Sequence, residues 1–254
     1  MMILNHENYF SPEAEDYYLS YSQFKAFERC EEAAIVGIRK ERLCFTEGHF
    51  FEAILNDEET TFMEEHPEML TNTGHLRSNY QKIVECAAAV QRHPMLKDII
   101  VRCQKQRILI GVIAGVPFKG CIDLYDPSTA DSYDTKAVKD FKKVWSPENG
   151  ARLDWYFAYG YHYQAAIYRE LIWQNFRTVG DQHLIAATKE SVPDVGFYRF
   201  NGEILDNALE IIEAYAPRYA AIKRGEIKAE RCGHCDWCKS TKEITRPVII
   251  EEFK

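Results

Sequence analysis

The sequence contains no apolar run long enough to cross a bilayer, which requires about 20 residues of α-helix. Its beginning, MMILNHENYFSPEAEDYY, is acidic and has no hydrophobic signal-peptide region. We therefore expect a cytoplasmic protein that does not enter the membrane. In that compartment the eight cysteines are expected to be thiols or metal ligands and not disulfides.

The chain also has no internal repeat, no low-complexity segment and no Gly/Ser-rich linker. We expect one domain over residues 1–254, with a helical N-terminal segment at about 19–105 and a cysteine-rich C-terminal segment at about 228–254. A hydrophobic content of 46% is that of an ordered globular protein. The net charge of −8 argues against a general binder of polyanions, but it says little about a local site.

Local patterns predict alternating blocks of helix and strand. Ser20 and Gln23 form a capping box at the start of a helix that continues through Cys30. The other expected helices lie at 47–55, at 78–102 with an interruption at Pro94, at 152–178 and at about 203–224. Strands are expected at 107–115 and 116–126, which form a hairpin across Gly115, and at 130–138, 183–190 and 195–201. This order predicts a mixed central β-sheet flanked by helices on both faces, an α/β or α+β fold.

The segment FKGCIDLYDPSTADSYDTKAV, residues 118–138, places Asp123 in one expected strand and Asp134 near the end of the next. Antiparallel neighbours bring such residues side by side, and Lys136 shares a face with Asp134 because strand side chains alternate. Two close carboxylates repel each other unless a hard cation such as Mg²⁺ binds between them. With a lysine beside the metal, the set suits metal-assisted hydrolysis of a phosphodiester. The alternative is that Asp123 caps a turn and that Asp134 and Lys136 form a surface ion pair.

Five segments in order carry a family resemblance: SYSQFKAFERCE, EGHFFEAIL, FKGCIDLYD, DTKAV and YHYQAAIYREL. Together they resemble the PD-(D/E)XK nuclease superfamily and, more closely, the RecE-like exonucleases of phages and prophages (the exonuclease VIII group). The resemblance covers about residues 19–240 and implies a restriction-endonuclease-like core. It implies that Asp123, Asp134 and the carbonyl of Thr135 bind Mg²⁺ or Mn²⁺, and that Lys136 is the catalytic lysine. In the family a helix motif G-x-x-x-H supplies a further ligand, and Glu52 stands here in place of the histidine.

Gln164 and Tyr168 match the family's Q-x-x-x-Y motif, and their spacing of four residues places them on one helical face. The resemblance implies that both belong to the active site. The amide could hold the attacking water or the lysine, and the phenol could touch a phosphate. The alternative is an aromatic core helix, which explains the tyrosine well and a glutamine in its middle poorly.

Three cysteines form the C-x₂-C-x₂-C run of RCGHCDWCK: Cys232, Cys235 and Cys238. Clustered cysteines in a cytosolic chain indicate a metal site. Resemblance to CRISPR-associated nucleases and the AddB helicase-nuclease implies that Cys30 is the fourth ligand of a [4Fe–4S] cluster. Zn²⁺ bound by Cys₄, or by Cys₃ with His234, is an alternative, and so is a set of packed cysteines without metal.

The run KAVKDFKKVW forms a local basic patch with three lysines after Lys136, at Lys139, Lys142 and Lys143. Such a patch suits DNA phosphates, although a solvated surface loop has the same composition. No helix carries an array of arginine or asparagine for reading base edges, so sequence-independent cleavage is expected.

The leading hypothesis is therefore a Mg²⁺-dependent deoxyribonuclease that acts on linear duplex ends. The resemblance implies 5′ to 3′ resection in phage-type homologous recombination, a homo-oligomeric ring, and a RecT-like single-strand annealing protein as partner. One alternative is a non-catalytic nucleic-acid-binding module with a cysteine-bound metal. Another is a cluster-bearing nuclease of repair or CRISPR adaptation.

Overall fold

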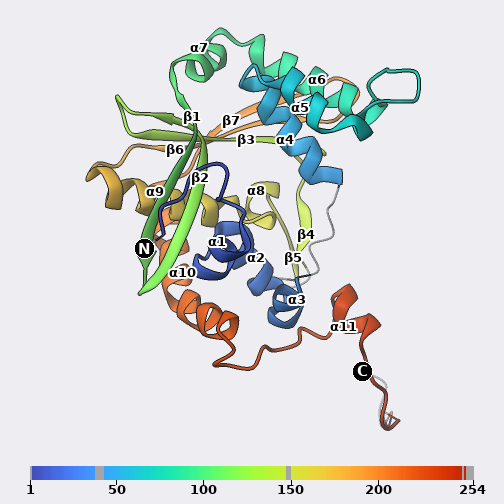
Figure 1. Cartoon of the computed structure of the whole chain (residues 1–254), viewed down its shortest axis with the longest axis vertical. Helices are drawn as coiled ribbons and strands as arrows, with labels where there is room; N and C mark the ends of the chain where they lie inside the picture. The colour runs from blue at the N-terminus through green and yellow to red at the C-terminus, as the bar shows by residue number, and fades with distance from the viewer. Residues whose placement is uncertain (1, 38–42, 147–149, 248, 250–254) are drawn as a thin grey trace.

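The computed structural model describes residues 2–37, 43–146, 150–247 and 249, and its centre is a mixed sheet of five strands (Figure 1). The strand order is β1-β2-β3-β6-β7. The strands span β1 Gln104–Ile113, β2 Val116–Asp126, β3 Asp131–Val138, β6 Gln182–Thr188 and β7 Val195–Arg199. Strands β3 and β6 are parallel and the other neighbours are antiparallel, so the sheet is mixed, as the sequence predicts.

The expected hairpin between β1 and β2 is confirmed. Ile113 and Val116 are cross-strand partners, and the two residues between them, Ala114 and Gly115, have φ of +48° and +77°. Two successive positive φ values are the mark of the tight hairpin turn whose twist matches that of the flanking strands.

The described helices lie mostly on the two faces of the sheet, and the one nearest the C-terminus stands apart from it (Figure 1). They are α1 Pro12–Tyr17, α2 Tyr21–Arg29, α3 Glu31–Val36, α4 Leu43–Leu55, α5 Glu59–Glu65, the 3₁₀ turn η1 Pro67–Met69, α6 Ser78–Gln91, α7 Pro94–Arg102, α8 Trp155–Ala158, α9 Tyr161–Phe176, α10 Gly202–Lys223 and α11 Asp236–Ser240. None of these helices is of a length and hydropathy that would let it span a membrane.

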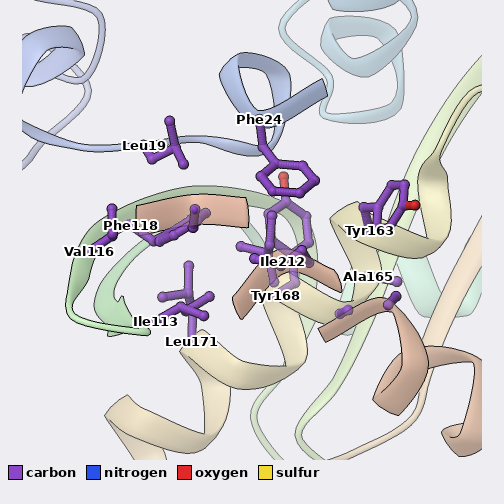
Figure 2. Close-up of a cluster of buried hydrophobic side chains, with 14 of the residues drawn as sticks. Leu19, Phe24, Ile113, Val116, Phe118, Tyr163, Ala165, Tyr168, Leu171 and Ile212 are labelled. Carbon is purple, nitrogen blue, oxygen red and sulfur yellow. The ribbon is translucent and has the colours of Figure 1, made fainter. Parts of the chain in front are cut away.

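Each face of the sheet has its own hydrophobic cluster. On one face α9 packs with α2 and α10 against β1 and β2, and Figure 2 shows Phe24, Phe118, Leu171 and Ile212 in this cluster. On the other face α4, α6 and α7 pack around residues of β2, β3 and β6, such as Ile185. The β3 strand contacts α4 and also α9, so it is packed against helices of both layers.

Two expected helices are interrupted. The helix that starts after Ser20 ends at Arg29, because Cys30 has an extended backbone, and α3 begins at Glu31. The expected helix 152–178 is likewise wrong in its first part. It is replaced by β5 (Ala151–Leu153), which pairs with β4 (Val144–Ser146), and by the short α8; Gly160 with φ of +80° then separates α8 from α9. The interruption expected at Pro94 is present, with the proline in the first turn of α7.

Candidate active site

The two aspartates stand where β2 and β3 separate. These strands pair from Asp126 and Asp131 to Leu124 and Tyr133, and beyond that point β3 continues beside β6. Asp123 follows on β2 at the point of divergence, where an unpaired strand edge leaves room for its side chain to turn toward β3. The local backbone thus directs a buried carboxylate into the gap between two strands.

Asp123 is fixed by hydrogen bonds from β3. Its Oδ2 accepts one from the backbone N–H of Thr135 at 2.8 Å and one from the hydroxyl of the same residue at 3.2 Å. Asp134 and Lys136 flank Thr135 on the other face of the strand. The Lys136 Nζ lies 2.7 Å from Asp134 Oδ2 and 3.9 Å from Asp123 Oδ2, so one ammonium group contacts both carboxylates.

A third carboxylate, Glu52 of α4, belongs to the same electrostatic group. Burial raises the pKa of Glu52 well above its ordinary value, and the charge of Asp123 adds to the effect. Burial also raises the pKa of Asp134, to about 7, against the opposing effect of Lys136. Burial alone would lower the pKa of Lys136, but Asp134, Asp123 and Glu52 hold it well above its usual range. Three acidic groups thus share one cation, which is the charge imbalance that a divalent metal corrects.

Two buried oxygens are available to a further cation. Among the described residues, Gln164 Oε1 has no hydrogen-bond donor, and Asp134 Oδ2 has only the ion pair with Lys136 and no well-aligned hydrogen bond. A narrow crevice lined by Glu52, Asp123 and Thr135 lies at the same part of the sheet as Asp123. Carboxylate and carbonyl oxygens are the ligands of Mg²⁺ and Mn²⁺, so the donor set fits the metal that the sequence motif implies.

Gln164 and Tyr168 form a chain of hydrogen bonds from α9 to the sheet. Gln164 Nε2 lies 2.8 Å from Asp134 Oδ1 and 2.9 Å from the hydroxyl of Tyr168. The Tyr168 hydroxyl in turn donates to the backbone carbonyl of Cys121 at 2.7 Å. The amide therefore holds Asp134 and not Lys136, and the phenol is anchored to β2 and does not point outward to a phosphate.

A glycine in β2 lets α9 come this close. A Cβ atom on Gly120 would lie 2.8 Å from Tyr168 Cε1 and 3.1 Å from Leu171 Cδ1, which is closer than packed carbon atoms approach. The Gly-Cys-Ile-Asp part of the motif thus places α9 and its glutamine against the strand that carries Asp123.

Gln106 of β1 is a site residue that the sequence pattern does not indicate. Its Nε2 donates to Glu52 Oε2 at 3.3 Å, and its Oε1 accepts from the Cys121 thiol at 3.1 Å. Its φ of +49° lies in the left-handed region, which is rare for a residue other than glycine and which often marks functional sites. A lone glutamine in a strand has no spacing or motif that would reveal this role.

The lysines expected to contact DNA lie just beyond β3. Lys139, Lys142 and Lys143 are exposed, and only Lys143 has an ion-pair partner, Asp154 at 3.7 Å, among the residues that the structure describes. They are therefore accessible, and their role in DNA binding stays a prediction.

The four cysteines of the expected metal site come together. The Sγ atoms of Cys30, Cys232, Cys235 and Cys238 all lie within 4.8 Å of one another. Cys30 Sγ is 3.6 Å from Cys238 Sγ, and Cys232 Sγ is 3.8 Å from Cys238 Sγ. Burial opposes ionisation of Cys232, but hydrogen bonds from the backbone of His234 and Cys235 lower its pKa to about 6. The His234 ring is turned away from this group, with Nδ1 2.9 Å from the carbonyl oxygen of Cys232.

Ion pairs also tie this C-terminal segment to α3. Arg231 Nη1 lies 2.7 Å from Glu32 Oε2, and the Trp237 indole N–H donates to the same oxygen at 2.8 Å. Arg218 of α10 binds both carboxylate oxygens of Glu31. The residues that follow Cys30 are thus held against α10 and the C-terminal segment that carries the other three cysteines.

Comparison with protein families agrees with this geometry. The model of a family described as a PDDEXK-like domain of unknown function (DUF3799) matches residues 20–241. The chain belongs to this PDDEXK-like family. The superfamily expected from the Asp and Asp-Thr-Lys motif is thereby confirmed, and so is the fold class; the closer placement with RecE-like enzymes stays a prediction.

Solved structures give the same result. The crystal structure of a protein described as a "putative exonuclease", from Eubacterium rectale, is similar with a TM-score of 0.89 and 27% sequence identity, covering 98% of this chain and 97% of that one. A second structure, that of SSO0001, aligns with a TM-score of 0.29 and 11% identity over 65% of this chain and 74% of its own, which is too low a similarity to bear on function. No curated protein matches the chain.

Proposed function

We propose that this protein is a divalent-metal-dependent deoxyribonuclease that degrades linear duplex DNA from its ends. The observation that carries the proposal is the contact of Lys136 with both Asp123 and Asp134 at the divergence of β2 and β3, with Glu52 lining the same crevice as Asp123. The description of the Eubacterium rectale protein supports the exonuclease activity. It is a statement about that protein, and here it enters only as support.

The chemistry assigns a role to each side chain. The carboxylates of Asp123, Asp134 and Glu52, with the Thr135 carbonyl, would hold Mg²⁺ or Mn²⁺, which when bound supplies Lewis-acid activation of water and phosphate. Lys136 would neutralise the charge that develops on the phosphate in the transition state. Gln164 would keep Asp134 in position through its 2.8 Å hydrogen bond.

The finer features of the activity rest on the RecE-like segments. These features are 5′ to 3′ polarity, a role in phage-type recombination, a homo-oligomeric ring and a single-strand annealing partner. A non-catalytic binding module is the second candidate. The complete set of three carboxylates and a lysine disfavours it, because binding alone does not need buried carboxyl groups such as Glu52 and Asp134, whose pKa values burial and the charge of Asp123 raise.

The test compares end-labelled linear duplex with covalently closed circular DNA, in Mg²⁺ and in EDTA. We expect the linear DNA to be degraded in Mg²⁺ only and the circle to be spared. Lys136→Ala should lose nearly all activity, whereas Lys97→Ala, on the exposed side of α7, should match the parent. A Lys136→Ala protein with parental activity would rule out this active site, and a nicked or linearised circle would rule out the exonuclease assignment.

The cysteine group is proposed to hold one tetrahedral ion such as Zn²⁺. With Zn–S bonds of about 2.3 Å, tetrahedral geometry places the sulfurs about 3.8 Å apart. The Sγ separations of 3.6 and 3.8 Å agree with that value. In a [4Fe–4S] cluster each thiolate binds a different iron, so the sulfurs lie further apart, and these distances favour the single ion over the cluster that the resemblance implies. Anaerobic purification followed by metal analysis should give zinc in a colourless protein; iron with sulfide in a brown protein would reverse this choice.

A further inference from the structure

A small hairpin follows the strand that carries the candidate catalytic lysine. Strands β4 and β5 follow directly after β3, the strand that carries Lys136, and form a separate two-stranded sheet away from the central one (Figure 1). Trp145 in the middle of β4 is 57% exposed. Its cross-strand partner, Arg152, is exposed as well.

Aromatic packing connects the hairpin to the catalytic lysine. Phe141, which precedes β4, stacks on Trp155 with ring centroids 5.3 Å apart. Trp155 contacts the ring of Tyr161 at 5.8 Å, and that ring lies 5.6 Å from Lys136 Nζ. The base of the hairpin therefore packs in the same buried cluster as Tyr161, the ring that contacts Lys136.

The other tryptophans differ from Trp145 in being covered or engaged. Trp155 is 2% exposed, and the Trp237 indole N–H donates to Glu32. Trp173 is 43% exposed, and the Arg177 guanidinium lies 5.7 Å from its ring centroid. An open tryptophan face beside cationic side chains is the surface that single-stranded nucleic acid prefers, because every base can stack on it.

The charge around the hairpin also favours a polyanion. Residues 139–154 include four lysines and arginines and three aspartates and glutamates, a net charge of +1 in a chain whose net charge is −8. The exposed lysines Lys142 and Lys143 lie just before Trp145 along the chain. Adjacent exposed lysines in an acidic protein mark where phosphates would approach.

We propose that Trp145 stacks on an unpaired base of the DNA strand that passes the active site, while Arg152 contacts a phosphate of the same strand. This inference rests on the proposed function and adds to it a binding surface for single-stranded DNA. Unpaired DNA is required because the faces of internal bases in a duplex are already stacked and closed to a tryptophan.

The experiment measures binding of fluorescein-labelled oligo(dT) and of a blunt-ended hairpin duplex in EDTA, which prevents cleavage. Trp145→Ala should weaken binding of oligo(dT) at least about fivefold, the lower limit for loss of one base stack, and should affect the blunt duplex much less. Trp145→Phe should keep most of the affinity, and Trp145→Leu, which is apolar but has no π face, should not. The matched control is Trp173→Ala, which removes the other exposed tryptophan and should leave binding unchanged.

Salt dependence separates stacking from charge. Trp145→Ala should leave the slope of log K against log salt unchanged, whereas Arg152→Gln should reduce its size by about 0.7 for one phosphate contact. Parental affinity for oligo(dT) in Trp145→Ala would overturn the inference, and so would an equal loss with Trp173→Ala or with the blunt duplex. A changed sedimentation coefficient with unchanged DNA affinity would assign the tryptophan to a contact between copies of the chain instead. Cleavage of linear DNA by the parent is assayed in parallel. If the parent cleaves DNA but Trp145→Ala binds oligo(dT) normally, only the inference about Trp145 fails. If the parent cleaves no DNA, the proposed function fails.

Discussion

Replacing Gln106 by glycine should weaken metal binding and leave the free energy of unfolding nearly unchanged. The residue has a φ of +49°, a conformation that costs a residue with a Cβ about 1–2 kcal/mol. Glycine removes that cost, but its freer unfolded chain costs about 0.5–1 kcal/mol. The two effects nearly cancel, so we expect the free energy of unfolding to change by about 1 kcal/mol or less.

The same substitution removes the hydrogen bond from Gln106 Nε2 to Glu52 Oε2. Loss of a residue that orients a metal-ligating side chain typically weakens metal affinity by about 10–100-fold. We therefore expect Gln106→Gly to require correspondingly more Mg²⁺ for activity and to bind Mn²⁺ more weakly, with a nearly parental urea midpoint.

Urea unfolding and direct titration of Mn²⁺ by electron paramagnetic resonance measure the two effects independently of catalysis. Ala114→Gly is the control, because Ala114 has the same left-handed conformation, with φ of +48°, in the exposed turn between β1 and β2. It should gain the same relief of strain with no change in metal binding. Parental Mn²⁺ affinity in Gln106→Gly would refute the orienting role of the amide.

Three further changes test the rest of the site. Glu52→Gln removes a carboxylate while keeping the shape of the side chain, so it should raise the Mg²⁺ concentration needed for activity and lower turnover, and Glu52→His should restore part of the activity. If the Mg²⁺ titrations of the parent and of Glu52→Gln are identical, Glu52 is an ordinary helix residue and not a metal ligand. Cys30→Ser and Cys235→Ser should lower the melting temperature by similar amounts, and the double variant should lower it by little more, because either substitution alone breaks the shared metal site. If the two decreases in melting temperature add up in the double variant, the cysteines do not share one ion. Gly120→Ala should lower the free energy of unfolding in urea by about 1–3 kcal/mol because the added methyl group would overlap α9, whereas the methyl group of Gly202→Ala meets open space and should change that free energy little. Equal changes in the two variants would show that the close approach of α9 to Gly120 does not matter for stability.

Local patterns in the sequence were sufficient for much of the fold. Alternating and β-branched runs predict β1, β2 and β3, and the position of Gly115 predicts the hairpin between β1 and β2, because these features depend on neighbouring residues only. The spacing of Asp134 and Lys136 follows in the same way from the geometry of one strand, and the salt bridge between them agrees with it. The resemblance to PD-(D/E)XK nucleases then placed the set in a family that the comparison confirms.

Tertiary packing decided what local patterns cannot express. The helix through Cys30 has a continuous helical pattern in the sequence, but the chain breaks there and brings a thiol to a segment 208 residues away. Gln106 reaches Glu52 only because β1 lies beside β2 and takes a left-handed conformation at one residue. The hairpin that carries Trp145 is held at its base by the stacking of Phe141 on Trp155, a contact between side chains distant in sequence. In each case the deciding free energy comes from groups that are distant in sequence, so it exists only once the chain has folded.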